Sequence, residues 1–575
     1  MRFIFTIIVV LNSFSSNCQK IGIDTTLLVG KDMGLNEYKN MVVDQWGNKY
    51  VIGGYKGNVS IGGYMLTSNL SNHWEARAVY LAKYNRSNEL DWIKRVAQGD
   101  TLFMPSIVLN GKGLPYLSYQ FYGRLKLQNA TLNSFGLSDM VICELDTSGN
   151  MNNAFQIGSS QAEGGSIKNN MVFDGLGGYY FCGTFNSMVN KVDTLFIGSD
   201  TLVSDSLGNS DIFIVKFDSL NNPVWARKYG GNGLDGAQIT YSRNRIYLLG
   251  VVGHFLNNNI GGLTFSTPQS YLRRGFVAQL DTAGNGMWAR HFGSGSPDLL
   301  SSLSPVDLSA HGDNVSFTAL DFSNIQNVFY FEGGPTLTGS DQRDYVIATY
   351  DTLGNFKWNR ISKSSGSEVL TAVVHDSLNN LYGLGYHNFR LDFPTDSLYG
   401  MGGSDIHVVS YDSNGTYRFA FSAGGAGGDI SSDIKITKQG EIYIVGGTTS
   451  NPCYMGNDTL YPPIGQSTIF YARIDSIDSI PNVSTSLQDF TRQDWSIYPN
   501  PVFDIMNIQV ATDKVNNLEQ VAIYDMLGRQ IKIQNLTTQV RSDYIPINIS
   551  ALSEGVYIVT IKTKEATSSR KIIKR

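Results

Sequence analysis

Charged residues are scarce in this chain of 575 residues. Asp, Glu, Lys and Arg together make up 16% of it, against roughly 25% in an average soluble protein. The formal net charge is −5, and the body of the chain contains no block of basic residues. Proteins that bind DNA or RNA present clustered Lys and Arg, so we expect no nucleic-acid partner.

Long apolar runs are also missing. The run at residues 3–11 is far shorter than the ~20 residues of a membrane-spanning helix, so we expect no transmembrane segment. With Arg2 before it and Ser16 and Cys18 after it, this run is typical of a secretory signal peptide over residues 1–18. Lipid modification of Cys18 is the alternative, although the preceding Ser-Ser-Asn fits a lipoprotein cleavage site poorly.

Cysteine is rare as well. Removal of residues 1–18 would leave Cys143, Cys182 and Cys453. An odd number of cysteines in an exported protein argues against a framework of disulfides. Cys143 and Cys182 lie in the apolar segments VICEL and YYFCG, so we expect buried, unreactive thiols.

Glycine and aromatic residues are abundant: there are 60 Gly, 31 Tyr and 29 Phe, a composition typical of β-structure with many turns. The segment DTLGNFKW at 351–358 has near-copies at 281–288 and 218–225. Its first position recurs seven times, at intervals of 61 to 72 residues, at Asn85, Asp146, Asp218, Asp281, Asp351, Asp412 and Asp475. The chain therefore contains an internal repeat, which decides the fold class.

Each repeat predicts four antiparallel strands. A β-branched and aromatic run precedes each turn, a strand with one large aromatic follows it, and a strand–turn–strand pair such as 433–448 lies upstream. Seven such sheets around an axis can bury faces that one sheet alone would expose. We predict an all-β fold: a seven-bladed β-propeller of four-stranded blades over residues 19–475, whose N-terminal strand, 20–30, completes the last blade and removes its open edge.

The repeated segment itself predicts structure rather than chemistry. Its Asp should accept a hydrogen bond from the backbone two residues on, and its Gly-Asn pair should take the left-handed conformation. The aromatic residue after the turn should pack between blades. These predicted inter-blade aromatics are Trp92, Trp225, Trp288, Trp358 and Phe419.

No catalytic, cofactor-binding or metal-binding residue is predicted. The segment GNGLDG at 231–236 has the glycine spacing of a dinucleotide site, but a strand follows where that site needs a helix. The seven histidines lack metal-ligand spacing, and no G-x-S-x-G segment occurs. The sequence leaves open whether carboxylates from distant repeats come together as a catalytic pair. We expect no cofactor. The alternative is a calcium ion bound at Asp146, Asp281 or Asp351, although each of these turns offers a single acidic side chain and calcium loops offer several.

The segment WARKYGGNGLDGAQITYSRNRIYLLG at 225–250 resembles the β-propeller repeats of exported bacterial proteins, the SBBP-like repeats. These repeats run Trp, a Gly-Gly pair, an Asp and then a Tyr-containing strand that ends in Gly. The resemblance extends over residues 20–475 and is clearest in repeats three, four and seven. It implies a propeller fold, but the family has no single activity.

The tail carries a second resemblance. The segments WSIYPNPVFDIMNIQV (495–510), VAIYDMLGRQI (521–531), LSEGVYIVTI (552–561) and RKIIKR (570–575) resemble the C-terminal sorting domain of the type IX secretion system. The matching positions are Tyr498, Pro499, Asn500, Pro501, Gly528, Gly555, Tyr557, Lys571 and Lys574. This implies export by the type IX machinery of a Bacteroidota-type bacterium to the cell surface or the medium. We expect residues 494–575 to form this domain as a small Ig-like β-sandwich, after a polar linker at 476–493.

Two functions follow from this organisation. The first is a non-catalytic binding or adhesion protein of the cell surface, in which variable loops on a rigid propeller recognise an extracellular glycan or protein. The second is a secreted enzyme that degrades polysaccharide or peptide at the propeller axis. Asp-Ser/Thr-apolar triplets, such as those at 193, 200 and 218, are read either as O-glycosylation acceptors of Bacteroidota or simply as turn formers.

Overall fold

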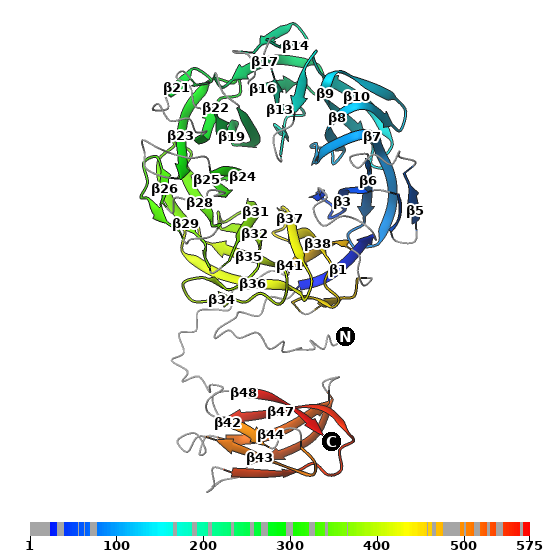
Figure 1. Ribbon diagram of the computed structural model, residues 1–575, viewed down its shortest axis with the longest axis vertical. Coiled ribbons are helices and arrows are strands. Elements are labelled where there is room, and N and C mark those ends of the chain that lie inside the picture. Colours follow the sequence, from blue (N-terminus) through cyan, green and yellow to red (C-terminus); the bar gives the residue numbers. More distant parts are fainter. Residues whose placement is uncertain are drawn as a thin grey trace. The chain divides into compact units, whose positions relative to one another are not determined.

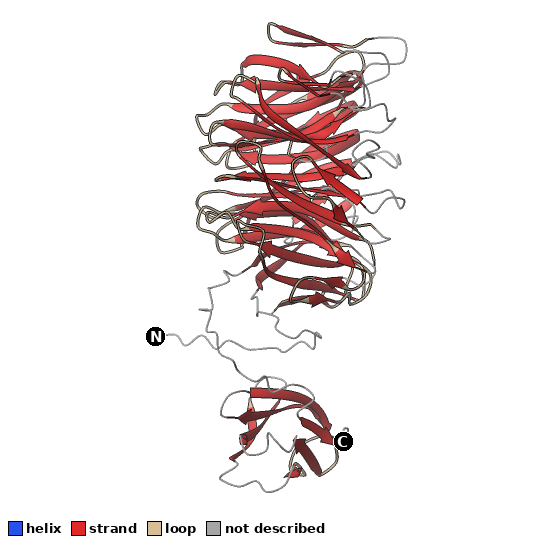
Figure 2. Cartoon of the chain, turned by 90° about the vertical axis from the view of Figure 1, so that its left-hand side faces the viewer, coloured by secondary structure: helices blue, strands red, loops and turns tan. Residues whose placement is uncertain are grey.

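In the computed structural model, the residues that are described form β-strands joined by turns and loops, with no helix among them (Figure 2). These residues are 23–30, 39–474 and 495–574, without 56, 62–63, 69–76, 165–168, 187–191, 205–209, 232–234, 254–257, 266–273, 295–302, 321–327, 340–342, 365, 457, 463–466, 499–501, 511–517, 526–528, 536–543 and 564–566. The predicted signal peptide and linker lie outside the described residues. The chain divides into two compact units, one within residues 11–476 and the other at 477–575.

The first unit contains the repeats, and the long strands of each repeat pair antiparallel. In order they are β2 (Lys39–Val43), β3 (Lys49–Tyr55), β6 (Arg77–Tyr84) and β7 (Leu90–Leu109); β8 (Pro115–Leu127), β9 (Thr131–Leu145) and β10 (Met151–Ile157); β12 (Met171–Phe173), β13 (Tyr179–Asn186), β16 (Ser210–Phe217) and β17 (Pro223–Tyr229); β18 (Gly236–Ser242), β19 (Arg245–Val252), β22 (Arg274–Leu280) and β23 (Gly286–Ser294); β24 (Ser304–His311), β25 (Asn314–Leu320), β28 (Tyr345–Asp351) and β29 (Phe356–Ile361); β31 (Glu368–His375), β32 (Leu381–His387), β35 (Asp405–Tyr411) and β36 (Tyr417–Gly425); and β37 (Asp429–Ile436), β38 (Ile442–Thr448) and β41 (Thr468–Ile474).

The prediction of separate four-stranded sheets is wrong for the first three repeats. Their strands form one twelve-stranded sheet. Strand β7 runs for 20 residues and pairs with β6 through its first half and with β8 through its second. The short β11 (Ala162–Gly164) then pairs with both β9 and β13. Because β7 bends at irregularities near Gly99 and Phe103 instead of ending, its backbone hydrogen bonds continue from one repeat into the next.

The repeats also contain short hairpins that the sequence pattern did not predict. Six of them lie between the second and third long strands of a repeat: β4–β5 (Asn58–Ile61, Tyr64–Thr67), β14–β15 (Thr194–Ile197, Asp200–Val203), β20–β21 (Asn258–Ile260, Leu263–Phe265), β26–β27 (Val328–Phe331, Leu337–Thr338), β33–β34 (Leu391–Asp392, Ser397–Leu398) and β39–β40 (Cys453–Met455, Asp458–Leu460). Strands of two to four residues show too little alternation to be recognised from sequence.

The two ends of the first unit meet in one sheet. Strand β1 (Ile23–Gly30) pairs antiparallel with β41, in the order β1-β41-β38-β37, which is the pairing predicted for the N-terminal strand. One buried cluster combines Tyr80 and Tyr84 of the first repeat with Tyr443 and Tyr471 of the last. Figure 1 shows the sheets following one another around a centre, with β24, β31 and β37 on the inner side.

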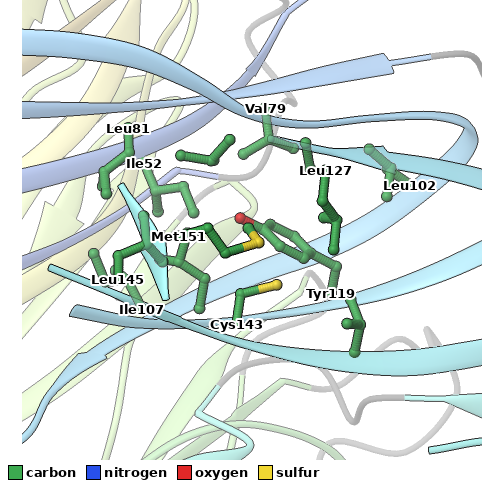
Figure 3. Close-up of a cluster of buried hydrophobic side chains, with 14 of the residues drawn as sticks. Ile52, Val79, Leu81, Leu102, Ile107, Tyr119, Leu127, Cys143, Leu145 and Met151 are labelled. Carbon is green, nitrogen blue, oxygen red and sulfur yellow. The ribbon is translucent and has the colours of Figure 1, made fainter. Parts of the chain in front are cut away.

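Buried side chains join each repeat to a neighbour. Figure 3 shows the cluster between the first two repeats, in which Ile52, Val79 and Leu81 face Tyr119 and Met151. Equivalent clusters join the second to the third repeat, the third to the fourth, the fourth to the fifth and the fifth to the sixth. Apolar burial between sheets therefore holds this unit together. The predicted buried thiols of Cys143 and Cys182 are confirmed, and Cys453 is buried as well.

The second unit is a small pair of sheets. One has the order β42-β43-β46 (Trp495–Tyr498, Ile505–Val510, Tyr544–Asn548), and the other β45-β44-β47-β48 (Gln530–Asn535, Leu518–Asp525, Gly555–Thr563, Thr567–Lys574). Residues from both sheets, such as Ile508, Ile547, Ile523 and Val559, form one buried cluster. The alternation of apolar residues along these strands produces that common core.

Candidate functional site

The repeated Asp turn is a self-contained hydrogen-bonded unit. In the turn at 351–355, Asp351 Oδ1 accepts from the backbone N–H groups of Leu353 and Asn355, and Oδ2 accepts from the Asn355 side-chain amide. Gly354 takes the left-handed conformation, with φ at +80°. The prediction that the asparagine is also left-handed is wrong, because its side chain instead bonds back to the Asp. Both carboxylate oxygens of this turn are therefore used by the turn itself.

The predicted aromatics contact the turn of the following repeat. The indole N–H groups of Trp92, Trp288 and Trp358 donate to the carbonyls of Thr147, Thr352 and Ser413, at 3.2, 3.1 and 3.3 Å. Trp288 and Trp358 are buried, whereas Trp92 and Trp225 are half-buried. The ring of Trp225 lies against Gly284 of the next turn. Buried Phe419 differs, since its aromatic neighbour is Tyr382 of its own repeat.

A basic residue beside each of these aromatics adds a second contact. Arg290 lies over the Trp288 ring and donates from Nε to the Gly354 carbonyl at 2.9 Å. Arg227 lies over Trp225 and donates to the Asn285 side chain, and Lys94 does the same with Trp92 and Asn150. In the Trp-x-Lys/Arg pattern, the aromatic ring and the basic side chain beside it therefore both contact the turn of the next repeat.

Polar side chains gather on the inner strands of the first unit. Asp307 on β24 accepts from the Asn169 side chain and from the backbone N–H of Val373 on β31, at 2.7 and 2.9 Å. Asp433 on β37 pairs with Lys435 at 2.8 Å. Burial opposes the charge on Lys435, but Asp433 and Asp307 raise its pKa above the usual value. Asp307, which is 3% exposed, ties β24 to residues of the third and sixth repeats, whereas the fully buried Asp433 pairs within its own strand.

A cavity lies beside the short hairpin of the first repeat. Its volume is about 410 Å³, within the range of small-molecule sites. Its walls come from β5, β7 and the end of β8, together with the last residue of β3: Tyr55, Met65, Leu66, Thr67, Arg95, Val96, Ala97, Lys126, Leu127 and Gln128. No sequence motif predicted this site, because its residues come from four separate segments and the hairpin that frames it was not recognised.

The polar side chains of the cavity are those of two cations, Arg95 and Lys126, and of Tyr55, Thr67 and Gln128. Arg95 Nη1 donates to the Thr67 carbonyl at 2.8 Å, which holds the guanidinium against the hairpin. Within the described part of the chain, no carboxylate lies at ion-pair distance from Arg95 or Lys126. The Tyr55 hydroxyl is buried without a hydrogen-bond partner. Burial raises the pKa of Tyr55, and the charge of Arg95 opposes this.

No metal centre is built from side chains in the described ranges, where His, Cys, Asp and Glu do not form groups of three or more that could hold an ion. Nor do those ranges contain a helix with the length and apolarity needed to cross a membrane. Among the Asp-Ser/Thr triplets, Thr201, Ser219 and Ser377 are exposed and Thr101 is buried. Glycan attachment needs an exposed hydroxyl, so the glycosylation hypothesis applies to the first three.

The predicted sorting residues fall in the second unit where they are described. Gly555 begins β47, and the Tyr557 hydroxyl donates to the Ser553 carbonyl at 2.9 Å. On β48, Lys571 pairs with Ile558, and Lys574 is 8% exposed with its Nζ 3.9 Å from Asp504. Tyr498 ends β42. Pro499, Asn500, Pro501 and Gly528 lie outside the described residues.

Residues 496–575 match the family of secretion system C-terminal sorting domains. No curated protein matches the chain. Similar solved structures include a member of the DUF4221 family from Bacteroides vulgatus, 9% identical over 79% of this chain and 97% of that one, with a TM-score of 0.30. Another is an acylaminoacyl peptidase from Pyrococcus horikoshii, 8% identical over 71% of this chain and 57% of that one, with a TM-score of 0.31. The sorting domain identifies an exported protein, secreted or held at the cell surface, that interacts with the secretion machinery.

Proposed function

We propose that this exported protein is a non-catalytic binding or adhesion protein, built as a seven-bladed β-propeller that carries its ligand site in the cavity beside hairpin β4–β5. The observation that carries the proposal is the cavity itself, which brings to one place two cations without acidic partners among the described residues and a buried hydroxyl without a hydrogen-bond partner. Ligand sites in proteins are hollows of this size, lined by apolar side chains and a few polar groups.

The propeller interpretation rests on how the first unit is joined. The pairing of β1 with β41 covers the edge of β41 with the N-terminal strand, and the tyrosines of the first and last repeats share one buried cluster. Buried clusters join the first six repeats in sequence and the last repeat to the first. A frame held in this way can present variable loops for recognition. The short hairpins differ in sequence from repeat to repeat, whereas the turns keep a common pattern with Asp at the first position in six of the seven copies.

The sorting tail supports a role outside the cell. A domain recognised by the type IX machinery brings the first unit to the surface or the medium, where its partners are extracellular glycans or proteins. The axial carboxylates Asp307 and Asp433 are buried and engaged with Asn169, Val373 and Lys435. This engagement supports structural bridging by these groups.

A cavity-filling pair of variants tests the proposal. Thr67 is exposed at the end of β5, and Thr201 is exposed in the equivalent hairpin of the third repeat. We expect Thr67→Trp to abolish binding in an array of extracellular glycans and proteins while the melting temperature stays unchanged, and Thr201→Trp to bind as the wild type does. Equal binding by both variants would show that the cavity is not the ligand site.

A further inference from the structure

We infer that the cavity beside β4–β5 recognises an acidic saccharide, a sugar chain that carries carboxylate groups. This inference rests on the proposed binding function and specifies the ligand. It is argued from the charge of the cavity, from one orphaned hydroxyl and from the apolar part of the wall.

The described wall of the cavity carries a net positive charge. Among the residues that the structure describes, it contains Arg95 and Lys126 and no acidic side chain. In the protein as a whole acidic residues are in excess, with 49 Asp and Glu against 44 Lys and Arg, so a wall with two positive charges and no negative one departs from the average. Such a wall attracts an anion and disfavours a cationic or neutral ligand of the same shape.

Arg95 is positioned for a planar anion. One of its terminal nitrogens is fixed to the Thr67 carbonyl at 2.8 Å, which restrains the guanidinium plane. A restrained guanidinium forms paired hydrogen bonds with a carboxylate at a smaller entropic cost than a free side chain does. Lys126, exposed at the end of β8, adds a second positive charge that can pair with the carboxylate of the next sugar along the saccharide.

The orphaned hydroxyl points to a ligand with hydrogen-bonding groups. Tyr55 is 1% exposed, lines the cavity and has no partner for its hydroxyl oxygen. Several buried tyrosine hydroxyls in the described residues have no partner, and Tyr55 is the one of them that lines the cavity, where a ligand could supply the missing hydrogen bond. Sugar hydroxyls donate and accept hydrogen bonds, so a saccharide can complete Tyr55 in a way that an apolar anion cannot.

The rest of the wall suits the body of a sugar ring. Met65 and Leu66 present apolar surface beside the two cations, whereas the lining residues Val96, Ala97 and Leu127 are themselves buried. A pyranose ring has apolar C–H faces and a polar rim, so it can rest on these side chains while its carboxylate lies at Arg95. A small inorganic anion would leave this apolar surface uncovered, and its burial favours the larger ligand.

The test is calorimetric titration of the full exported chain with a galacturonic acid hexamer, its methyl ester and a sulfated neutral hexasaccharide. We expect the acid hexamer to bind and the methyl ester, which lacks the charge, to bind at least about ten-fold more weakly. Stronger binding of the sulfated sugar than of the acid would overturn the carboxylate assignment. Equal binding of acid and ester would overturn the inference while leaving the proposed binding function in place.

Matched variants separate recognition from folding. Tyr55→Phe and Tyr80→Phe each remove a buried hydroxyl that has no partner, and only Tyr55 lines the cavity. Neither loss should lower the melting temperature, because no protein hydrogen bond is broken. We expect Tyr55→Phe to weaken binding of the acid hexamer about three- to ten-fold and Tyr80→Phe to leave it unchanged.

Charge variants complete the test. Lys126→Gln should weaken binding about ten-fold, and Lys112→Gln, in an exposed turn away from the cavity, should weaken it less than two-fold. Equal effects of Lys126→Gln and Lys112→Gln would refute the site. If no saccharide binds, but Thr67→Trp abolishes binding of a protein partner, the saccharide inference fails and the proposed function stands. If Thr67→Trp changes no binding at all, the proposed function fails as well.

Discussion

The contact between Trp288 and the turn of the following repeat allows a quantitative prediction. Trp288 is 7% exposed, and a Cβ added to Gly354 would lie 2.7 Å from its Cδ2 atom. Gly354 has φ at +80°, where an L-residue costs roughly 1–2 kcal/mol. The clash with the ring adds about 1–3 kcal/mol, the usual cost of overpacking. We therefore expect Gly354→Ala to destabilise the protein by about 2–5 kcal/mol.

The clash, and only the clash, should disappear when the ring is removed. Trp288→Ala alone should cost about 3–5 kcal/mol through the cavity that it leaves. In that background Gly354→Ala should cost only the conformational strain of its positive φ. The loss of unfolding free energy in the double variant should therefore be smaller than the sum of the two single losses by about 1–3 kcal/mol. Gly440 is the matched control, because its φ is +85° and a Cβ added to it would have nothing within 4 Å.

The assay is equilibrium urea denaturation of the full chain, followed by far-ultraviolet circular dichroism, with midpoints compared at constant slope. Gly440→Ala should cost about 1–2 kcal/mol. Additivity of Trp288→Ala and Gly354→Ala within about 0.5 kcal/mol, or equal costs of Gly354→Ala and Gly440→Ala, would refute packing of the indole on the turn of the next repeat.

Three further predictions concern charge, closure and export. Burial, and secondarily the charge of Asp344, raise the pKa of Glu368 from 4.5 to about 8. The neutral form of Glu368 therefore stabilises the fold at low pH, and this contribution is lost as pH rises through about 8. The melting temperature of Glu368→Gln should rise relative to that of the wild type between pH 5 and pH 9, and parallel curves of melting temperature against pH would contradict this. Deletion of residues 19–30 should expose the edge of β41 and lower the melting temperature; an unchanged value would argue against a closing role for β1. Removal of residues 494–575 should retain the protein inside a bacterium that has the type IX system, as cell fractionation would measure, whereas equal amounts at the surface would argue against sorting by this domain.

Local features were readable from the sequence because their causes are local. The Asp turn forms from hydrogen bonds within five residues, such as those of Asp351 to Leu353 and Asn355, and a glycine at its left-handed position is favoured by its lack of a Cβ. Strand runs beside these turns follow from alternation and β-branched composition. The sorting segments at the C-terminus were recognised in the same way, from residues that stand close together in the chain.

Contacts between distant residues were decided by tertiary structure alone. Whether β7 ends at a repeat boundary or continues through it depends on backbone pairing with β8, which no periodicity within the strand specifies. The cavity needed Tyr55, Arg95 and Lys126 to meet across three segments, and the repeat pattern treats all three as ordinary strand positions. Sequence by itself determined the period, the turns and the destination of the protein, because these depend on neighbouring residues. Packing in three dimensions decided the joining of the sheets and the chemistry of the cavity, because side chains far apart in the chain acquire a common environment only when the sheets assemble.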